Sequence, residues 1–309
     1  MRLHRPALPC AVSSTSATEA FAAAHGKIGN GELVVLALGR LGGGLLTHAS
    51  DLDLIYLFTG GIDTESTGKR PLGATLYFNR LASRVSAALS VPTAEGALYE
   101  VDTRLRPQGD KGPLAASVDS FRRYQREDAW TWEHMALTRA RIVAGSEQAR
   151  QEVAAVVTEA LCKQRDPAKL AGDVLAMRGD MARAKPPAGP LDVKNLRGGL
   201  VDLEFLVHFL QLRERSCFAP ELAAAIAALA AAGLVPSTLA DANALLNRVL
   251  IAARLLAPDL RLPHKAAAER LAQACGAPGY RQLESSLLAA RRGIMQSWTR
   301  TFNEEVEIA

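Results

Sequence analysis

The sequence predicts an α+β domain followed by an all-α domain, and three observations support this fold class. An apolar run with adjacent valines at residues 33–38 predicts a buried strand, and four glycines follow it within six positions. A second apolar run, at residues 52–58, predicts another strand that begins beside acidic residues. From residue 220 to residue 305, Ala- and Leu-rich segments alternate with short breakers, which is typical of antiparallel helices packed in a bundle.

The composition limits the classes of function. The 309 residues are 49% apolar, which suffices for a large core and two compact units. A net charge of +4 and an aromatic content of 5% do not indicate a nucleic-acid partner. The four cysteines lack Cys-x-x-Cys spacing, so neither a zinc site nor a disulfide framework is indicated and a reducing compartment is favoured. No apolar stretch reaches the roughly 18 residues of a membrane helix, so we expect a cytoplasmic protein without a membrane partner.

Breakers and composition shifts predict the domain boundaries. Residues 1–16 are basic, Ser-rich and free of acids, which predicts an atypical or disordered N-terminus. Residues 17–165 form the predicted α+β domain and residues 166–309 the predicted helical domain. The Pro- and Gly-containing segment at residues 184–190 is typical of a linker.

Periodicity predicts the remaining elements, because apolar residues recur at helical spacing in several segments. In the first domain we expect helices over residues 15–25, 72–89 and 121–141, and a third strand over residues 98–105. In the second domain we expect helices over residues 200–213, 221–232, 237–256, 265–275 and 280–302.

Two aspartates at the start of the second strand are the first candidate site residues. Asp51 and Asp53 are two positions apart, so their side chains share one face of the strand. Two neighbouring carboxylates are costly to bury unless a cation compensates them. Mg²⁺ prefers oxygen ligands and accompanies phosphates, and a glycine turn that can approach phosphate oxygens precedes the pair. The sequence therefore predicts a nucleotide–metal site.

Three other interpretations of this stretch were weighed. A Rossmann fingerprint requires Gly-x-Gly-x-x-Gly at the start of a full helix, whereas the spacing here is Gly-x-x-Gly-Gly-Gly and six residues separate Gly44 from Asp51. A P-loop is excluded, because no Gly-Lys-Ser or Gly-Lys-Thr follows the glycines. The remaining alternative is a surface turn whose acidic residues cap a strand, and a third acidic residue further along the chain disfavours it.

That third carboxylate is Asp102, in the predicted third strand. It could bind an ion and accept the proton of an attacking hydroxyl. Arg104 and Arg106 follow it, and guanidinium groups bind phosphate in a bidentate manner, so both are candidates for a triphosphate. The alternative is that these two arginines only neutralise the acidic cluster.

Three polar residues further along the chain have two interpretations each. His134 is either a ligand or base, or a structural histidine on a helix. Lys194, before the Gly198-Gly199 turn, is a candidate nucleotide contact. The structural alternative for that segment is that Asp202 lies near a helix start, where its charge suits the helix dipole.

These residues carry a family resemblance. Gly39-Arg40 followed by Ser50-Asp51-Leu52-Asp53 resembles the nucleotidyltransferase superfamily typified by DNA polymerase beta. More narrowly, several motifs in the same order resemble the glutamine synthetase adenylyltransferases, and specifically their carboxy-terminal, AMP-adding half. These motifs are Gly-Arg-Leu-Gly-Gly-Gly, Ser-Asp-Leu-Asp-Leu-Ile, Val-Asp-Thr-Arg-Leu-Arg-Pro, Trp-Thr-Trp-Glu-His and Gly-Gly-Leu-Val-Asp-Leu-Glu-Phe.

The resemblance implies a polymerase-beta-like domain, with a small mixed sheet and flanking helices, followed by a helical bundle. It implies that three aspartates bind Mg²⁺ and that ATP is the substrate. The implied metal ligands and catalytic residues are Asp51, Asp53 and Asp102, and the implied triphosphate contacts are Gly39, Arg40, Gly42 and Ser50.

The implied function is transfer of AMP from ATP to a tyrosine of glutamine synthetase, with release of pyrophosphate, in the control of nitrogen assimilation. The implied partners are glutamine synthetase and, as a regulator, a PII signalling protein. One alternative is a non-catalytic truncated homologue that binds either partner through its helical bundle. Another is transfer of a nucleotide to a small molecule or to RNA.

Overall fold

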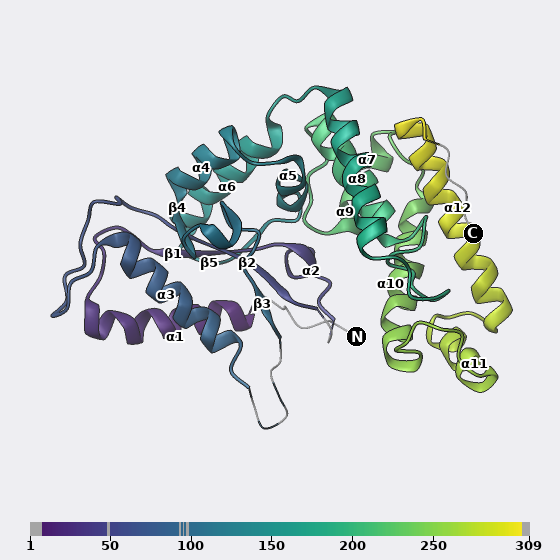
Figure 1. Ribbon diagram of the computed structural model, residues 1–309, viewed down its shortest axis with the longest axis horizontal. Helices are drawn as coiled ribbons and strands as arrows, with labels where there is room; N and C mark the ends of the chain where they lie inside the picture. Colours follow the sequence, from purple (N-terminus) through teal and green to yellow (C-terminus); the bar gives the residue numbers. More distant parts are fainter. Residues whose placement is uncertain (1–7, 48–49, 93, 95, 97–98, 305–309) are drawn as a thin grey trace. The chain divides into compact units, whose positions relative to one another are not determined.

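The computed structural model describes residues 8–47, 50–92, 94, 96 and 99–304. The chain divides into two compact units, Met1–Lys163 and Gln164–Ala309. The described strands all belong to the first unit, which also contains helices, and the described elements of the second unit are all helices (Figure 1). A small sheet combined with many helices confirms the mixed α/β character predicted from the sequence.

The elements of the first unit alternate between strands and helices. In chain order they are α1 (Leu8–His25), β1 (Leu33–Ala37), α2 (Gly39–Gly42), β2 (Leu52–Phe58), α3 (Ala74–Leu89), β3 (Val101–Asp102), the 3₁₀ turn η1 (Gly109–Lys111), β4 (Ala115–Ser117), α4 (Val118–Glu127), α5 (Thr131–Leu137), β5 (Arg141–Ala144) and α6 (Glu147–Cys162). The second unit contains α7 (Pro167–Ala184), α8 (Leu200–Glu214), α9 (Leu222–Ala231), α10 (Thr238–Leu256), α11 (Lys265–Ala274) and α12 (Tyr280–Phe302).

The sheet of the first unit is mixed and is organised around β2. Its strand order is β3-β2-β1-β5, and β4 also pairs with β2. β1 is antiparallel to both β2 and β5, whereas β3 and β4 are parallel to β2. β3 lies beside the start of β2, at Leu52, and β4 lies beside its end, at Phe58. The start of β2 is therefore the point where two acidic segments of the chain meet.

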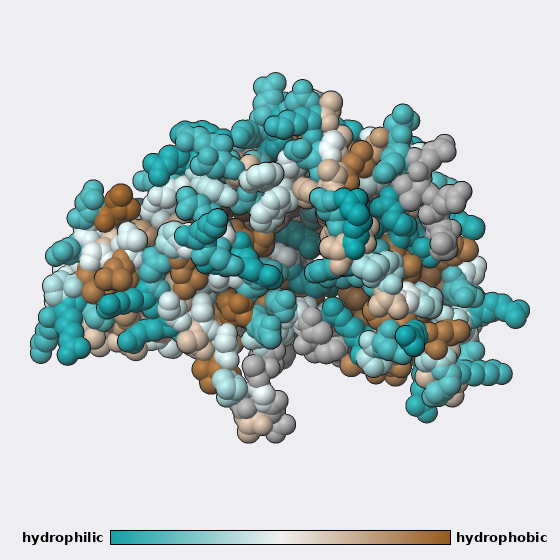
Figure 2. Space-filling model, in the orientation of Figure 1, coloured by the Kyte–Doolittle hydropathy of each residue, from teal (hydrophilic) through white to brown (hydrophobic). Residues whose placement is uncertain are grey.

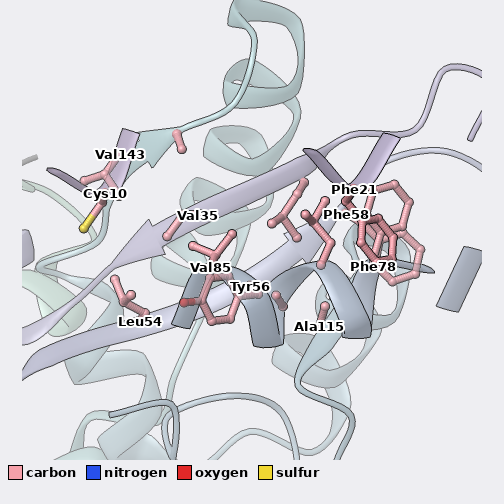
Figure 3. Packing of buried hydrophobic residues seen from close by; sticks show 14 of the residues in the cluster. Cys10, Phe21, Val35, Leu54, Tyr56, Phe58, Phe78, Val85, Ala115 and Val143 are labelled. Atoms are coloured by element: carbon pink, nitrogen blue, oxygen red, sulfur yellow. The ribbon is translucent and has the colours of Figure 1, made fainter. Parts of the chain in front are cut away.

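The main core lies between the sheet and helices α1 and α3. Alternate residues of β1 and β2 face this layer, and Figure 3 shows Tyr56 and Phe58 directed toward the helices. The rings of Phe58 and Phe78 are stacked with centroids 4.6 Å apart, and Phe21 joins the same group. Burial raises the pKa of Tyr56 to about 12, and the Ser86 hydroxyl donates a 2.9 Å hydrogen bond to the tyrosine oxygen. Such burial is the main driving force for this fold.

Helices α4 and α6 contact the sheet from its other side, so the first unit has helices on both faces of a small sheet (Figure 1). The strands β1 and β2 are consequently almost entirely buried, which explains their near-continuous apolar sequence. On the surface drawn in Figure 2, apolar residues of this unit form small separate groups rather than one continuous patch.

The second unit is built around α8, which packs against α7, α9, α10 and α12. α8 is apolar on most of its circumference, as expected for a central helix. Trp298 of α12 is fully buried, and its ring and that of Phe209 both contact Phe302. The helices predicted between residues 200 and 302 are confirmed to within a few residues. Among the helices formed by described residues, none has the length and apolarity needed to cross a membrane.

The structure contains two long helices that were not expected, α6 and α7, and it differs from the expected elements in three other places. A helix begins at Leu8, where residues 1–16 were expected to be atypical or disordered; residues 1–7 lie outside the described part of the chain. The third strand, expected over residues 98–105, is limited to Val101–Asp102, because the chain turns directly after Asp102; Leu98 lies outside the described residues.

The third difference concerns residues 121–141, where the prediction of one continuous helix is wrong. The chain forms α4, breaks at Asp128 and Ala129, and continues as the short helix α5. The segment that follows is the strand β5, whose Ile142 pairs with Leu36 of β1. Two β-branched residues at an open sheet edge favour strand pairing over helix continuation.

Candidate functional site

The glycine turn after β1 supports the Asp53 carboxylate. Gly39 has a φ of +52°, and a Cβ atom at this position would lie 2.0 Å from Asp53 Oδ2. The backbone N–H of Leu38 donates a 2.9 Å hydrogen bond to the Asp53 carbonyl oxygen. Because the Asp53 side chain lies against the backbone of Gly39, only glycine meets both the conformational and the steric requirement here.

The second half of the turn is held by β5. A Cβ atom at Gly42 would lie 2.1 Å from the carbonyl oxygen of Arg139, and Arg141 Nε donates a 2.8 Å hydrogen bond to the Gly42 carbonyl oxygen. The N–H of Gly42 donates to the Leu38 carbonyl oxygen at 2.7 Å. Arg40 Nη1 donates to the carbonyl oxygen of Leu45 at 3.5 Å, within the same turn. The phosphate contacts expected for Gly39, Arg40 and Gly42 stay predictions.

The structure brings two of the three aspartates together. Asp53 of β2 and Asp102 of β3 are direct partners in the parallel register. Neighbouring strands lie about 4.8 Å apart, and partners in register direct their side chains to the same face. Asp51 precedes β2 and is exposed. A pair of carboxylates from distant parts of the chain therefore lies beside the glycine turn.

Asp102 is paired with an arginine. Arg104 Nε lies 3.0 Å from Asp102 Oδ1 and 2.9 Å from Oδ2, Nη2 also donates to Oδ2, and the Arg104 backbone N–H donates to Oδ1 at 2.8 Å. The side-chain hydrogen bonds from Arg104 hold the pKa of Asp102 below its usual value, against the opposing effect of burial. The same hydrogen bonds raise the pKa of Arg104, and the charges of Asp102, Asp110 and Asp51 add to the effect. Asp102 is therefore ionised at neutral pH.

Arg106 stabilises the loop that follows β3. Its Nη1 donates to the carbonyl oxygen of Thr103 at 2.9 Å, to Thr103 Oγ1 at 3.0 Å and to Asp110 Oδ1 at 3.4 Å. Its Nε donates to the Gly112 carbonyl oxygen at 3.5 Å. Arg104 pairs with Asp102 and Arg106 with Asp110, which agrees with the alternative that these arginines neutralise acidic residues. The phosphate contacts expected for both arginines stay predictions.

Ser50 is buried beside the aspartates. Its Oγ accepts a 3.1 Å hydrogen bond from the N–H of Thr47 and lies 2.9 Å from Thr47 Oγ1. This pair closes the segment between the glycine turn and β2. The triphosphate contact expected for Ser50 stays a prediction.

The three aspartates are not arranged around one metal position. Among the residues that the structure describes, no three His, Cys, Asp or Glu side chains are arranged as ligands of one metal ion. The oxygens of Asp102 are directed to Arg104, and Asp51 lies before β2 with its side chain exposed. The metal set Asp51, Asp53 and Asp102 therefore stays a prediction, supported by the adjacency of the last two.

His134 and Glu133 connect α5 to α4. His134 is buried, and its Nε2 lies 3.0 Å from the carbonyl oxygen of Gln125, which favours the structural interpretation. Glu133, which the sequence analysis missed, is also buried; the Tyr124 hydroxyl donates to its Oε1 at 2.9 Å and the Trp130 N–H to its Oε2 at 2.9 Å. Burial raises the pKa of Glu133. The usual sequence signal is absent, because Trp130 is not one of the helix-start residues that pair with a glutamate three positions later.

Lys194 lies in the second unit, in the loop before α8, where its carbonyl oxygen accepts the N–H of Val201 at 3.1 Å. Its expected nucleotide contact stays a prediction. Asp202 is fully buried and accepts hydrogen bonds from Arg178 Nε at 2.6 Å, Arg197 Nη1 at 2.9 Å and the Gly198 N–H at 2.6 Å. Asp202 therefore anchors this loop to α7 and α8.

Comparison with known proteins finds similar families for both units. Residues 5–156 match the family "Glutamate-ammonia ligase adenylyltransferase", and residues 176–302 match "GlnD PII-uridylyltransferase". Related proteins are named bifunctional glutamine synthetase adenylyltransferase/adenylyl-removing enzyme. Those of Agrobacterium fabrum, Brucella suis and Rhizobium meliloti are 49%, 50% and 48% identical over 192, 189 and 190 residues.

These alignments cover 62%, 61% and 61% of this chain and 19% of each relative. The chain thus spans about a fifth of the length of the relatives that it matches. The paired aspartates and the glycine turn all lie inside the matched segment of residues 5–156. Over that segment, the chain is similar to the glutamate-ammonia ligase adenylyltransferase family.

Proposed function

We propose that this chain is an adenylyltransferase that moves AMP from ATP to a tyrosine of glutamine synthetase and releases pyrophosphate, in the control of nitrogen assimilation. One observation carries the proposal: Asp53 and Asp102 are adjacent on parallel strands, with Gly39 against the first carboxylate. Adjacent carboxylates beside a glycine turn suit metal-assisted transfer from a nucleoside triphosphate. Their position inside the segment matched to the adenylyltransferase family supports this assignment.

We also propose that the first unit has the polymerase-beta-like nucleotidyltransferase fold and that the second unit is a helical bundle. A mixed sheet with helices on both faces, and acidic residues on β2 and β3, supports the first assignment. The mutual packing of α8, α9, α10 and α12 supports the second.

The donor chemistry of the site fits Mg²⁺, which binds carboxylate oxygens. The lowered pKa of Asp102 keeps this residue ionised, as a ligand must be. When bound, Mg²⁺ would supply the positive charge that stabilises the attacking and leaving oxygens. The residues that would hold the ion are Asp51, Asp53 and Asp102. Those that would contact the triphosphate are Gly39, Arg40, Gly42, Ser50, Arg104, Arg106 and Lys194.

In the proposed reaction, the tyrosine oxygen forms a bond to the α-phosphorus of ATP, and the bond from that phosphorus to the pyrophosphate oxygen breaks. The hydroxyl proton must leave, because a phenol with a pKa of about 10 is mostly neutral at physiological pH. Asp102 is the proposed acceptor, since it is ionised and lies at the edge of the same site. The product is a tyrosine–AMP phosphodiester.

Glutamine synthetase is the proposed partner because the similar proteins are named for acting on it. A PII protein is a second proposed partner, supported by the match of residues 176–302 to a PII-uridylyltransferase family. The alternative of a non-catalytic homologue is not favoured, because all three aspartates are present.

The test is transfer of label to purified glutamine synthetase from ATP labelled at the α-phosphate. We expect label from the α-phosphate and none from the γ-phosphate, and a loss of at least about 100-fold in Asp53→Asn. Asp119→Asn is the matched control, because Asp119 is an exposed aspartate of α4 that pairs with Arg122 on the surface. Label from the γ-phosphate, or transfer that survives Asp53→Asn, would refute the proposal.

A further inference from the structure

The Asp102 carboxylate is already occupied by a cation from its own chain. Arg104 contacts both of its oxygens through Nε, adds a hydrogen bond from Nη2 to Oδ2, and donates its backbone N–H to Oδ1. A carboxylate offers about four lone-pair positions, so these contacts take most of its capacity. A divalent ion that uses Asp102 as a ligand must therefore displace the guanidinium from at least one oxygen.

Arg104 is surrounded by the acidic residues that would also attract a metal ion. Asp51 and Asp110 lie close enough for their charges to act on the guanidinium, in addition to Asp102. Asp53, the register partner of Asp102, completes the acidic group on the adjacent strand. Without a cation, these like charges would repel one another. Arg104 supplies that cation in the absence of an ion.

The side chain of Arg104 is exposed and has few partners, whereas that of Arg106 is enclosed by several. The side chain of Arg104 is 73% exposed, and within the described part of the chain its side-chain hydrogen bonds go to Asp102. The side chain of Arg106 is 11% exposed and is tied to Thr103, Asp110 and Gly112. The guanidinium is largely in solvent although the Asp102 side chain is only 17% exposed, so Arg104 stays hydrated when a divalent ion takes its place on the carboxylate.

Taking the proposed function as its basis, we propose that Arg104 is a placeholder cation: its guanidinium occupies the Asp102 carboxylate until a divalent ion binds there, and the released guanidinium then binds the phosphate oxygens of the incoming nucleotide. The fork geometry that matches a carboxylate also matches a phosphate group, so the exchange needs no new donor. Ion binding and nucleotide binding are thereby coupled through one side chain.

This exchange predicts effects of opposite sign for Arg104→Gln. Removing the competitor tightens the binding of Mn²⁺ alone, by about tenfold for a coupling of ordinary size. The same change removes a phosphate ligand and weakens binding of α,β-methylene-ATP in the presence of Mg²⁺, also by about tenfold. Electron paramagnetic resonance of free Mn²⁺ measures the first quantity, and isothermal titration calorimetry measures the second. Neither measurement depends on catalysis.

Arg126→Gln is the matched control. Arg126 is an exposed arginine of the same unit that pairs with a carboxylate, Glu127, at 2.8 Å, so its loss removes the same charge and the same kind of ion pair. We expect this control to bind both ligands as the wild type does. A general effect of net charge would change both variants alike, which would overturn the proposal.

The other outcomes separate this proposal from the proposed function. Unchanged or weaker Mn²⁺ binding in Arg104→Gln, with binding abolished in Asp53→Asn, overturns the placeholder role and leaves the metal site standing. Unchanged affinity for α,β-methylene-ATP overturns the transfer of the guanidinium to phosphate. Absence of Mn²⁺ binding in both the wild type and Arg104→Gln overturns the proposal together with the metal site of the proposed function.

Discussion

Replacing Gly39 with alanine tests whether the turn positions Asp53. The new methyl group would meet Asp53 Oδ2 at 2.0 Å and Cγ at 2.8 Å, well below the ordinary contact range that begins at 3.4 Å. The backbone cannot relieve this overlap by a small rotation, because φ is +52° and the turn is fixed between β1 and β2. The Asp53 carboxylate must therefore move.

The expected magnitudes follow from this geometry. The oxygen has to move by about 1.4 Å, and a displacement of about 1 Å in a catalytic group can cost about 100-fold in rate. The left-handed conformation costs alanine about 1 kcal/mol relative to glycine, and overpacking adds about 1–3 kcal/mol. We expect Gly39→Ala to lose about 2–4 kcal/mol of unfolding free energy and at least about 100-fold in AMP transfer.

The matched control is Gly233→Ala in the second unit. Gly233 has a similarly positive φ of +74°, and a Cβ atom there would meet nothing within 4 Å. The Gly233→Ala variant therefore has the conformational cost of a positive φ, about 1 kcal/mol, without any overlap of the new methyl group with a neighbouring atom. Urea unfolding followed by circular dichroism gives the free energies, and transfer of α-phosphate label gives the rates. If Gly39→Ala folds and keeps about half of the wild-type transfer rate, the positioning argument is wrong.

Two further predictions concern buried carboxylates. Asp202→Asn leaves Arg178 and Arg197 without their shared anion, and we expect a loss of about 3 kcal/mol in urea unfolding; a loss below about 1 kcal/mol would contradict the anchoring role. Burial raises the folded-state pKa of Glu133 above its ordinary 4.5, so its stabilising contribution is present below that pH and is lost as the pH rises through the raised pKa. Because Glu133→Gln cannot ionise, its stability relative to the wild type should increase as the pH rises from 4.5 through the raised pKa of Glu133; a constant difference would contradict this reasoning.

Prediction from the sequence worked best for strongly patterned elements with clear breakers, but it missed α6 and α7, which have 16 and 18 residues. The two central strands were predicted because continuous apolar runs bounded by glycines and acids have few other interpretations. Helices of the second unit, such as α10 and α12, were predicted because their breakers are glycines and prolines at the helix ends. The position of Asp53 on β2 was predicted as well, whereas Asp51 lies one residue before the strand begins.

Other features depend on contacts that no local pattern encodes. β5 has four residues, too few for a periodic signal, and it is a strand only because the edge of β1 is available for pairing. The same limit applies to Arg104. Its sequence placed it near Asp102, but whether it contacts that carboxylate or a phosphate depends on which partner is present. The adjacency of Asp53 and Asp102 requires a parallel pairing between distant segments.

The contact between Arg141 and the carbonyl oxygen of Gly42 has a consequence for synthesis of the chain. The turn beneath Asp53 is encoded early, yet its final shape depends on an edge strand that a ribosome delivers 99 residues later. Contacts of such long sequence separation form late in folding. A nascent chain released before residue 141 would contain all three aspartates of the proposed metal site. It would still lack the hydrogen bond from Arg141 that holds the glycine turn beside Asp53.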